Sequence, residues 1–197
     1  MDTLEELYKI YEEIAKDVLK SDSKVVFGDG NEDAEIMLIG EAPGEKEEQM
    51  GKPFVGAAGK NLDEFLSILN IKREDIYITN VVKIRPYKIN PATGKKSNRP
   101  PNKREIDAST NVLDKQINII KPSVVVTLGN IPLRAILKDN NAKIGDYHGK
   151  TIELNGFVLF PLYHPASIIY NRSLYDTYIE DVYKLKEYIN EHGIGGA

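Results

Sequence analysis

Short apolar runs alternate with amphipathic stretches along most of the chain. Four runs of five to eight residues are rich in Ile, Val, Leu and Phe, which is typical of strands buried in a parallel sheet. Around them, apolar residues recur at spacings of three and four, the period of a helix packed on one face. We therefore predict strands at 35–39, 75–82, 123–128 and 157–162, and helices at 3–20, 103–120, 174–191 and near 58–69 and 131–138.

This alternation predicts an α/β fold, in which right-handed crossovers place helices on both faces of a mainly parallel sheet. The length suits one domain over residues 1–197, with an N-terminal helical segment at 1–23. Residues 86–102 interrupt the rhythm with four prolines and several polar residues, so we expect a long basic loop there. The glycine-rich end, 193–197, is expected to fray.

Composition narrows the class of protein. There is no cysteine, which excludes disulfides and thiolate ligands. No apolar stretch reaches membrane-spanning length, and no signal peptide is visible, so we expect a cytoplasmic protein without a membrane anchor.

The net charge of −4 hides a strong asymmetry. Residues 1–48 carry fifteen acids and five bases, whereas residues 83–104 carry eight bases and no acid. Such a local excess of positive charge attracts phosphates, although a solvated basic loop without a partner would give the same pattern.

The segment 40–59 carries most of the chemical information. It follows the first predicted strand and contains five glycines, two prolines and four glutamates. In open α/β sheets, ligands bind at the carboxyl ends of the strands. Glu41, Glu47, Phe54, Asn80 and His164 all follow or end predicted strands, so we expect them to converge. An aromatic ring, an amide and an imidazole together suit a small planar heterocycle.

At these residues the chain resembles the uracil-DNA glycosylase superfamily, most closely its family 4. The matching segments are Gly40–Glu48, Gly51–Gly59, Thr79–Lys83, Val124–Gly129 and His164–Ala166, with Val25–Asn31 upstream. The resemblance implies a three-layer α/β/α sandwich around a four-stranded parallel sheet, and removal of uracil from DNA.

The resemblance also implies a role for each pocket residue. Phe54 would stack on a flipped uracil, and Asn80 would pair with its O4 and N3 edge, rejecting cytosine. His164 would donate to uracil O2 as the glycosidic bond breaks. Gly40 and Ala42 would line the base pocket. Of the acids, Glu47 would position the water and Glu41 would shape the pocket, a division that the sequence leaves open.

DNA contacts are expected on both sides of this pocket. The resemblance places an intercalation loop after His164, where Tyr170 or Ile169 would fill the gap left by the flipped base and Arg172 would meet a phosphate. Packing of Ile168 and Ile169 on the core is the alternative. A second set of contacts, to the DNA backbone, would come from the basic residues Lys83, Arg85, Lys95, Lys96 and Arg99.

One departure from the family concerns a cofactor. Family 4 enzymes typically hold a [4Fe–4S] cluster on four cysteines. Here the corresponding positions fall near Ile14–Asp17, at Ile84 and at about Ser109. Because thiolates hold such clusters, we expect no cluster, no metal and no other cofactor.

The sequence therefore predicts a monomeric, monofunctional uracil-DNA glycosylase that acts on uracil-containing DNA and is associated with the nucleoid. A catalytically weak, DNA-binding damage sensor of the same fold is the alternative. A phosphate-cradling nucleotide site is disfavoured, because four glutamates crowd the glycine-rich segment and no Walker-type Lys-Ser/Thr follows it.

Overall fold

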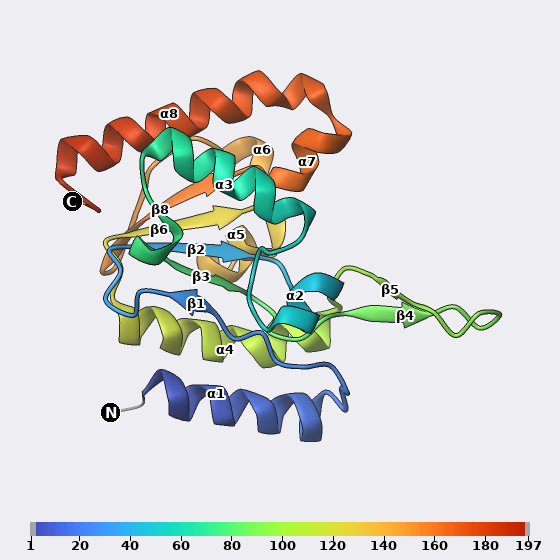
Figure 1. Ribbon diagram of the computed structural model, residues 1–197. Helices are drawn as coiled ribbons and strands as arrows, with labels where there is room; N and C mark the ends of the chain where they lie inside the picture. Colours follow the sequence, from blue (N-terminus) through green and yellow to red (C-terminus); the bar gives the residue numbers. More distant parts are fainter. Residues whose placement is uncertain (1–2, 196–197) are drawn as a thin grey trace.

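A computed structural model describes residues 3–195, and within them the side chains of all residues except 168–170 and 172. Its centre is a six-stranded sheet with the strand order β1-β3-β2-β6-β8-β7 (Figure 1). The four central strands are parallel, and both edge strands run antiparallel to their neighbours. In chain order the strands are β1 (Asp29–Gly30), β2 (Ile36–Gly40), β3 (Tyr77–Asn80), β6 (Val124–Leu128), β7 (Ile152–Leu154) and β8 (Phe157–Leu162).

Helices cover both faces of this sheet, giving three layers (Figure 1). Helices α3 (Ala57–Leu69) and α8 (Tyr175–His192) pack on one face. Helices α1 (Leu4–Glu13), α4 (Lys103–Ile120) and α5 (Asn130–Leu137) lie on the other. The remaining helices are η1 (Ile14–Val18), α2 (Glu45–Met50), η2 (Arg73–Asp75), α6 (Ile144–Tyr147), α7 (Pro165–Tyr170) and η3 (Arg172–Leu174).

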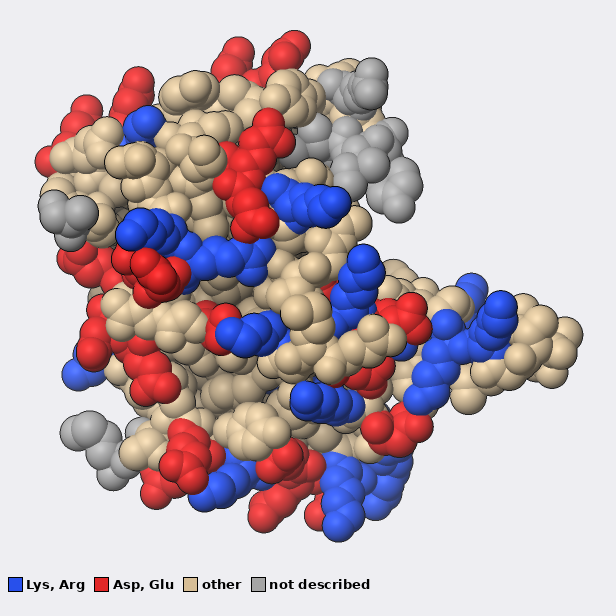
Figure 2. Space-filling model, viewed as in Figure 1, with Lys and Arg blue, Asp and Glu red and all other residues tan. Residues whose placement is uncertain are grey.

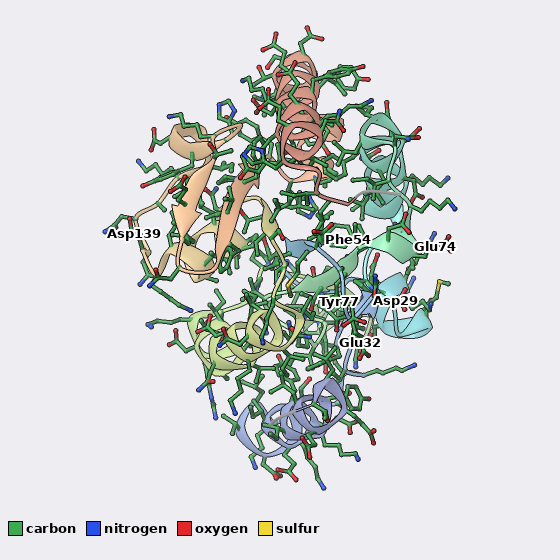
Figure 3. All side chains as sticks on the ribbon, turned by 90° about the vertical axis from the view of Figure 1, so that its left-hand side faces the viewer. Asp29, Glu32, Phe54, Glu74, Tyr77 and Asp139 are labelled. Carbon is green, nitrogen blue, oxygen red and sulfur yellow. The ribbon has the colours of Figure 1, made fainter. Side chains whose placement is uncertain are left out.

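The hydrophobic core has one half on each face of the sheet. Every residue of β2 and β6 is buried, as expected of parallel strands covered on both sides. In Figure 3, Phe54 lies toward the α3–α8 layer and Tyr77 toward the α1–α4 layer, and they belong to the corresponding halves of the core. The α/β/α sandwich with a four-stranded parallel centre is therefore confirmed, with an antiparallel strand added at each edge.

The N-terminal helix is well specified locally. Thr3 and Glu6 form a reciprocal capping box, which satisfies two free backbone N–H groups. Leu4, Leu7 and Tyr11 recur on its buried face and dock on the core beside α4. None of the helices in residues 3–195 combines the length and apolar character that a membrane span needs.

The expected loop at 86–102 contains a hairpin. Strands β4 (Tyr87–Ile89) and β5 (Lys96–Asn98) pair antiparallel and project from the body (Figure 1). Asp22 fixes its base by accepting hydrogen bonds from the Tyr87 hydroxyl and, at 2.9 Å, from Lys96 Nζ. The polar, exposed composition of β5 conceals the strand from pattern analysis.

The described part of the C-terminal tail is also more ordered than predicted. Ile194 packs on the core, and the N–H of Gly195 donates to the Glu35 carboxylate at 2.7 Å. Fraying from residue 193 was therefore the wrong expectation for 193–195, while 196–197 lie outside the described residues.

Candidate active site

A cavity of about 230 Å³ opens at the carboxyl ends of the central strands. It combines one aromatic ring, two amides, a carboxylate and an imidazole on a floor of small residues. The lining residues are Ala42, Gly44, Glu47, Phe54, Gly56, Ala57, Ala58, Asn80, Asn98 and His164. Five residues predicted from the sequence, Ala42, Glu47, Phe54, Asn80 and His164, thus lie together, whereas Gly40 and Glu41 lie outside the lining.

Phe54 is held in an unusual backbone conformation. Its φ of 52° is in the left-handed region, which a bulky residue adopts only when its surroundings enforce it. Arg73 donates to the Phe54 carbonyl at 2.6 Å. A Cβ on Gly59 would lie 2.1 Å from that carbonyl oxygen, so only glycine permits this approach. The backbone strain is thus stored at the residue whose ring lines the cavity.

Asn80 ends strand β3 and is almost fully buried. Its side chain lies beside Gly40 of β2, the residue opposite it in the parallel register. A Cβ on Gly40 would lie 2.4 Å from Asn80 Oδ1 and 2.6 Å from Phe54 Cζ. The absence of a side chain at position 40 therefore lets the amide and the ring occupy one pocket.

His164 caps the N-terminus of α7. Its Nδ1 accepts a 3.1 Å hydrogen bond from the N–H of Ala166, so the remaining ring nitrogen, Nε2, carries the proton. Burial lowers the pKa of His164 from 6.5 to about 4. The ring lies 6.0 Å from that of Phe54, with 26° between the planes. The site thus holds a neutral imidazole that donates through Nε2.

The Glu47 carboxylate organises the loop around the ring. It accepts hydrogen bonds from the N–H groups of Val55 at 3.0 Å, Gly56 at 2.7 Å and Gly44 at 3.2 Å. A carboxylate has about four acceptor sites, so one is left for a ligand.

Glu41 is half-buried, and desolvation raises the pKa of its carboxyl group.

Asn98 was not predicted from the sequence. It lies on β5, at the base of the hairpin, and contributes a second amide to the cavity. Its Oδ1 accepts a 2.7 Å hydrogen bond from Arg85 Nε, which leaves Nδ2 as the donor facing Gly44. The only signal in the sequence was its place in the basic segment, which points to phosphate rather than to the pocket.

Two of the predicted DNA contacts, Lys83 and Arg85, are contradicted by burial. Lys83 is fully buried, so it cannot reach a phosphate. Arg85 is 5% exposed and pairs with Glu45 and Glu48. Arg99 is half-buried and held bidentately by Glu105 at 2.7 and 2.8 Å, and its contact with DNA stays a prediction.

The other predicted DNA contacts have different outcomes. Lys95 is exposed on the hairpin, and Lys96 is partly exposed but paired with Asp22. The side chains of Ile168, Ile169, Tyr170 and Arg172 lie outside the described residues.

A larger hollow of about 550 Å³ lies between α4 and α5. Its lysines, Lys103 and Lys138, are ion-paired with Asp107 and Asp114. Among the described residues, those that line this hollow are aliphatic, polar or charged, so they offer no ring to stack on a planar ligand. The smaller cavity at the strand ends is therefore the better candidate on chemical grounds.

Comparison with known proteins gives the same picture. The family model described as the uracil DNA glycosylase superfamily matches residues 27–188. The chain belongs to the uracil-DNA glycosylase superfamily. It is 42% identical to the type-4 uracil-DNA glycosylase of Saccharolobus solfataricus over 85% of this chain and 77% of that protein. It is 38% identical to the type-4 enzyme of Thermotoga maritima over 98% and 100% of the two chains.

A more distant relative is the type-5 uracil-DNA glycosylase of Pyrobaculum aerophilum, 28% identical over 72% of this chain and 66% of that protein. The comparisons confirm the family and the enzyme class predicted from the motifs: a uracil-DNA glycosylase of DNA repair, a hydrolase of N-glycosyl bonds.

The positions that would hold a family 4 iron–sulfur cluster do not fit one. The chain has no cysteine, and residues 3–195 contain no group of three or more His, Asp or Glu side chains arranged for a metal. Ile84 is buried and apolar. Ser109 donates to the Glu105 carbonyl at 2.6 Å and shares a 2.7 Å hydrogen bond with the Tyr11 hydroxyl. Packing and hydroxyl contacts occupy the place of thiolates.

Proposed function

We propose that this chain excises uracil from DNA as a monofunctional glycosylase, leaving an abasic site without a metal, a cluster or a lysine Schiff base. The observation that carries the proposal is the convergence of Phe54, Asn80 and His164 on one cavity. The single-domain organisation, the monomeric state and the nucleoid association expected from the sequence stay predictions.

Base selection would come from Asn80. An amide offers an acceptor and a donor side by side, the complement of the N3 and O4 edge of uracil. Cytosine exchanges donor and acceptor on that edge, so its binding would leave buried polar groups unpaired. Phe54 would provide the stacking face for the extruded base.

Leaving-group stabilisation would come from His164. The departing uracil carries negative charge on O2, and a fixed donor aimed at it lowers the barrier. A neutral imidazole that donates through Nε2 suits this role, because its hydrogen bond strengthens as charge develops. No proton transfer is needed, so the low pKa of His164 is compatible with catalysis.

Glu47 would position the water, with Asn98 nearby, because both side chains line the cavity and both lie close to Gly44. Glu47 has about one acceptor site left after its three backbone hydrogen bonds, and it is one of the residues that line the cavity. A carboxylate there would also favour positive charge developing on the sugar. Glu41 is not one of the lining residues and would shape the pocket from the neighbouring position to Ala42.

DNA would be held next to the cavity by the exposed part of the basic segment. Three exposed lysines of the hairpin region, Lys88, Lys95 and Lys96, would follow the DNA backbone. Figure 2 shows that Lys and Arg side chains gather on the projecting arm. Tyr170 and Arg172 stay proposals, as wedge and phosphate contact, from their place after His164. Such binding should weaken as the salt concentration rises. The logarithm of the binding constant should fall with the logarithm of salt concentration by about 0.7–0.9 for each phosphate contact.

The proposal is tested with a uracil-containing oligonucleotide incubated in EDTA and then treated with alkali, which breaks abasic sites. Strand cleavage is expected for uracil and not for a matched thymine control. Asn80→Asp should impair uracil excision, because the carboxylate loses the amide donor. No cleavage of single-stranded or G·U duplex DNA would reject the enzyme, and retained binding would then favour the damage sensor.

A further inference from the structure

Lys83 is a buried amine that the proposed chemistry does not use. Its side chain is fully inaccessible in the turn after β3. None of its hydrogen-bond partners among the described residues is a carboxylate. Burial lowers the pKa of Lys83 well below its usual range. An apolar side chain of similar length would fill this space at less cost, so the hydrogen bonds that the amine makes are the feature to explain.

The contacts of Lys83 point to the end of strand β3. Its Nζ donates to the Asn80 carbonyl at 2.5 Å and to Thr79 Oγ1 at 2.9 Å. The Thr79 hydroxyl in turn donates to the Phe27 carbonyl at 2.6 Å. The backbone of Lys83 is fixed as well, because its N–H donates to the Tyr11 hydroxyl at 3.0 Å. The lysine is thus a rigid support, not a mobile side chain.

Asn80 lies between this support and the cavity. Its carbonyl is held by Lys83, and its amide lies within the pocket beside Gly40 and Phe54. Successive residues of a strand face opposite sides, and Thr79, the other partner of Lys83, faces the α4 layer through Gln116. A rotation of the Asn80 peptide would therefore move the amide relative to the ring.

We propose that Lys83 is a positioning residue that sets the orientation of the base-reading amide of Asn80. This inference rests on the proposed excision of uracil. Displacement of a reacting or recognising group by about 1 Å is enough to cost on the order of a hundredfold in rate. Loss of the Lys83 hydrogen bonds should therefore appear in kcat rather than in DNA affinity.

The test compares Lys83→Met, which keeps the volume and removes the donors, with Tyr11→Phe, which removes the hydroxyl that holds the Lys83 backbone. Lys83→Met should lower kcat at least about tenfold, with KM for DNA unchanged and a Tm no lower than that of Tyr11→Phe. Tyr11→Phe should lower Tm and leave kcat within about twofold. Wild-type kcat in Lys83→Met, or equal losses of kcat in both variants, would overturn the inference.

Two further measurements keep the test decisive. If Lys83→Met does not fold, Lys83→Gln replaces it. The Gln side chain is one bond shorter than that of Lys, so we expect kcat to fall at least about threefold. An unchanged kcat would overturn the positioning role. If the wild type does not excise uracil, the proposed function fails. The side-chain amide resonance of Asn80, in protein labelled with ¹⁵N-asparagine, then decides: it should shift in Lys83→Met and not in Tyr11→Phe, and no shift would reject the positioning role.

Discussion

The N–H of Ala166 donates to Nδ1 of His164, two residues earlier, and so fixes the tautomer of the ring that faces Phe54. The hydrogen bond belongs to the N-terminus of α7, where free N–H groups seek acceptors. The helix therefore selects the donating nitrogen, and burial keeps the ring neutral.

This arrangement predicts an unusual pH profile. Because the pKa of His164 is about 4 in the folded protein, kcat/KM should have no acid limb from this group near 6.5, the ordinary value. The unfolded chain binds this proton near 6.5, so the free energy of unfolding should fall as pH is lowered from 6.5 toward 4. Denaturant titrations from about pH 7 to pH 5 measure this, and His164→Asn should remove that part of the slope. An acid limb of activity near 6.5 that His164→Asn abolishes would contradict it.

Gly40→Ala should inactivate the enzyme with little effect on the rest of the fold. The added methyl group would overlap Asn80 Oδ1 and Phe54 Cζ, so amide and ring must separate. We expect kcat/KM for uracil to fall about a hundredfold. Gly145→Ala is the matched control, because its nearest atom beyond chain neighbours, the Tyr163 hydroxyl, is 3.9 Å away. Equal activity of both variants in the oligonucleotide assay would refute the packing argument.

Glu47→Gln separates two roles of this carboxylate. Gln replaces one acceptor oxygen with an NH₂ group that faces backbone donors, so the Gly44–Gly56 segment should loosen and unfolding should be easier by about 1–3 kcal/mol. If Glu47 also positions the water, kcat should fall further than in Arg73→Lys, which loosens the same loop through the Phe54 carbonyl. Equal losses of kcat at equal losses of stability would leave Glu47 a structural role only.

Removal of metals should leave the protein intact. Because Ile84 and the Tyr11–Ser109 hydrogen bond occupy the positions of thiolate ligands, protein refolded with a chelator should match untreated protein in Tm and activity. Its visible absorption spectrum should lack the bands of an iron–sulfur cluster. A drop in Tm on chelation would show a metal requirement.

The sequence predicts the layers better than the edges. The range 157–162 matches β8 and 103–120 matches α4, because long apolar runs and an amphipathic period mark them. Strands β1 and β7 were not predicted, because they are only two and three residues long and are exposed or partly exposed. Prediction of 75–82 overran β3, since Val81 and Val82 stay buried in the turn beyond the strand end.

The site shows the same division. The convergence of Phe54, Asn80 and His164 on one cavity could be predicted because each follows or ends a strand that the pattern marks. The prediction that Lys83 and Arg85 contact DNA was wrong, because the local excess of positive charge does not show that both side chains are buried. Asn98 was missed since its place depends on Arg85, thirteen residues earlier in the chain, and on a hairpin without an apolar face.

Through Asp22, the N-terminal part of the chain holds the β4–β5 hairpin as well as packing on the core. This residue precedes the sheet, yet it accepts hydrogen bonds from Tyr87 on one hairpin strand and Lys96 on the other. These hydrogen bonds therefore connect the β4–β5 hairpin to the N-terminal segment. We expect a truncation, a tag or a protease cut upstream of Asp22 to change the position of the hairpin, and with it any contact that the hairpin makes.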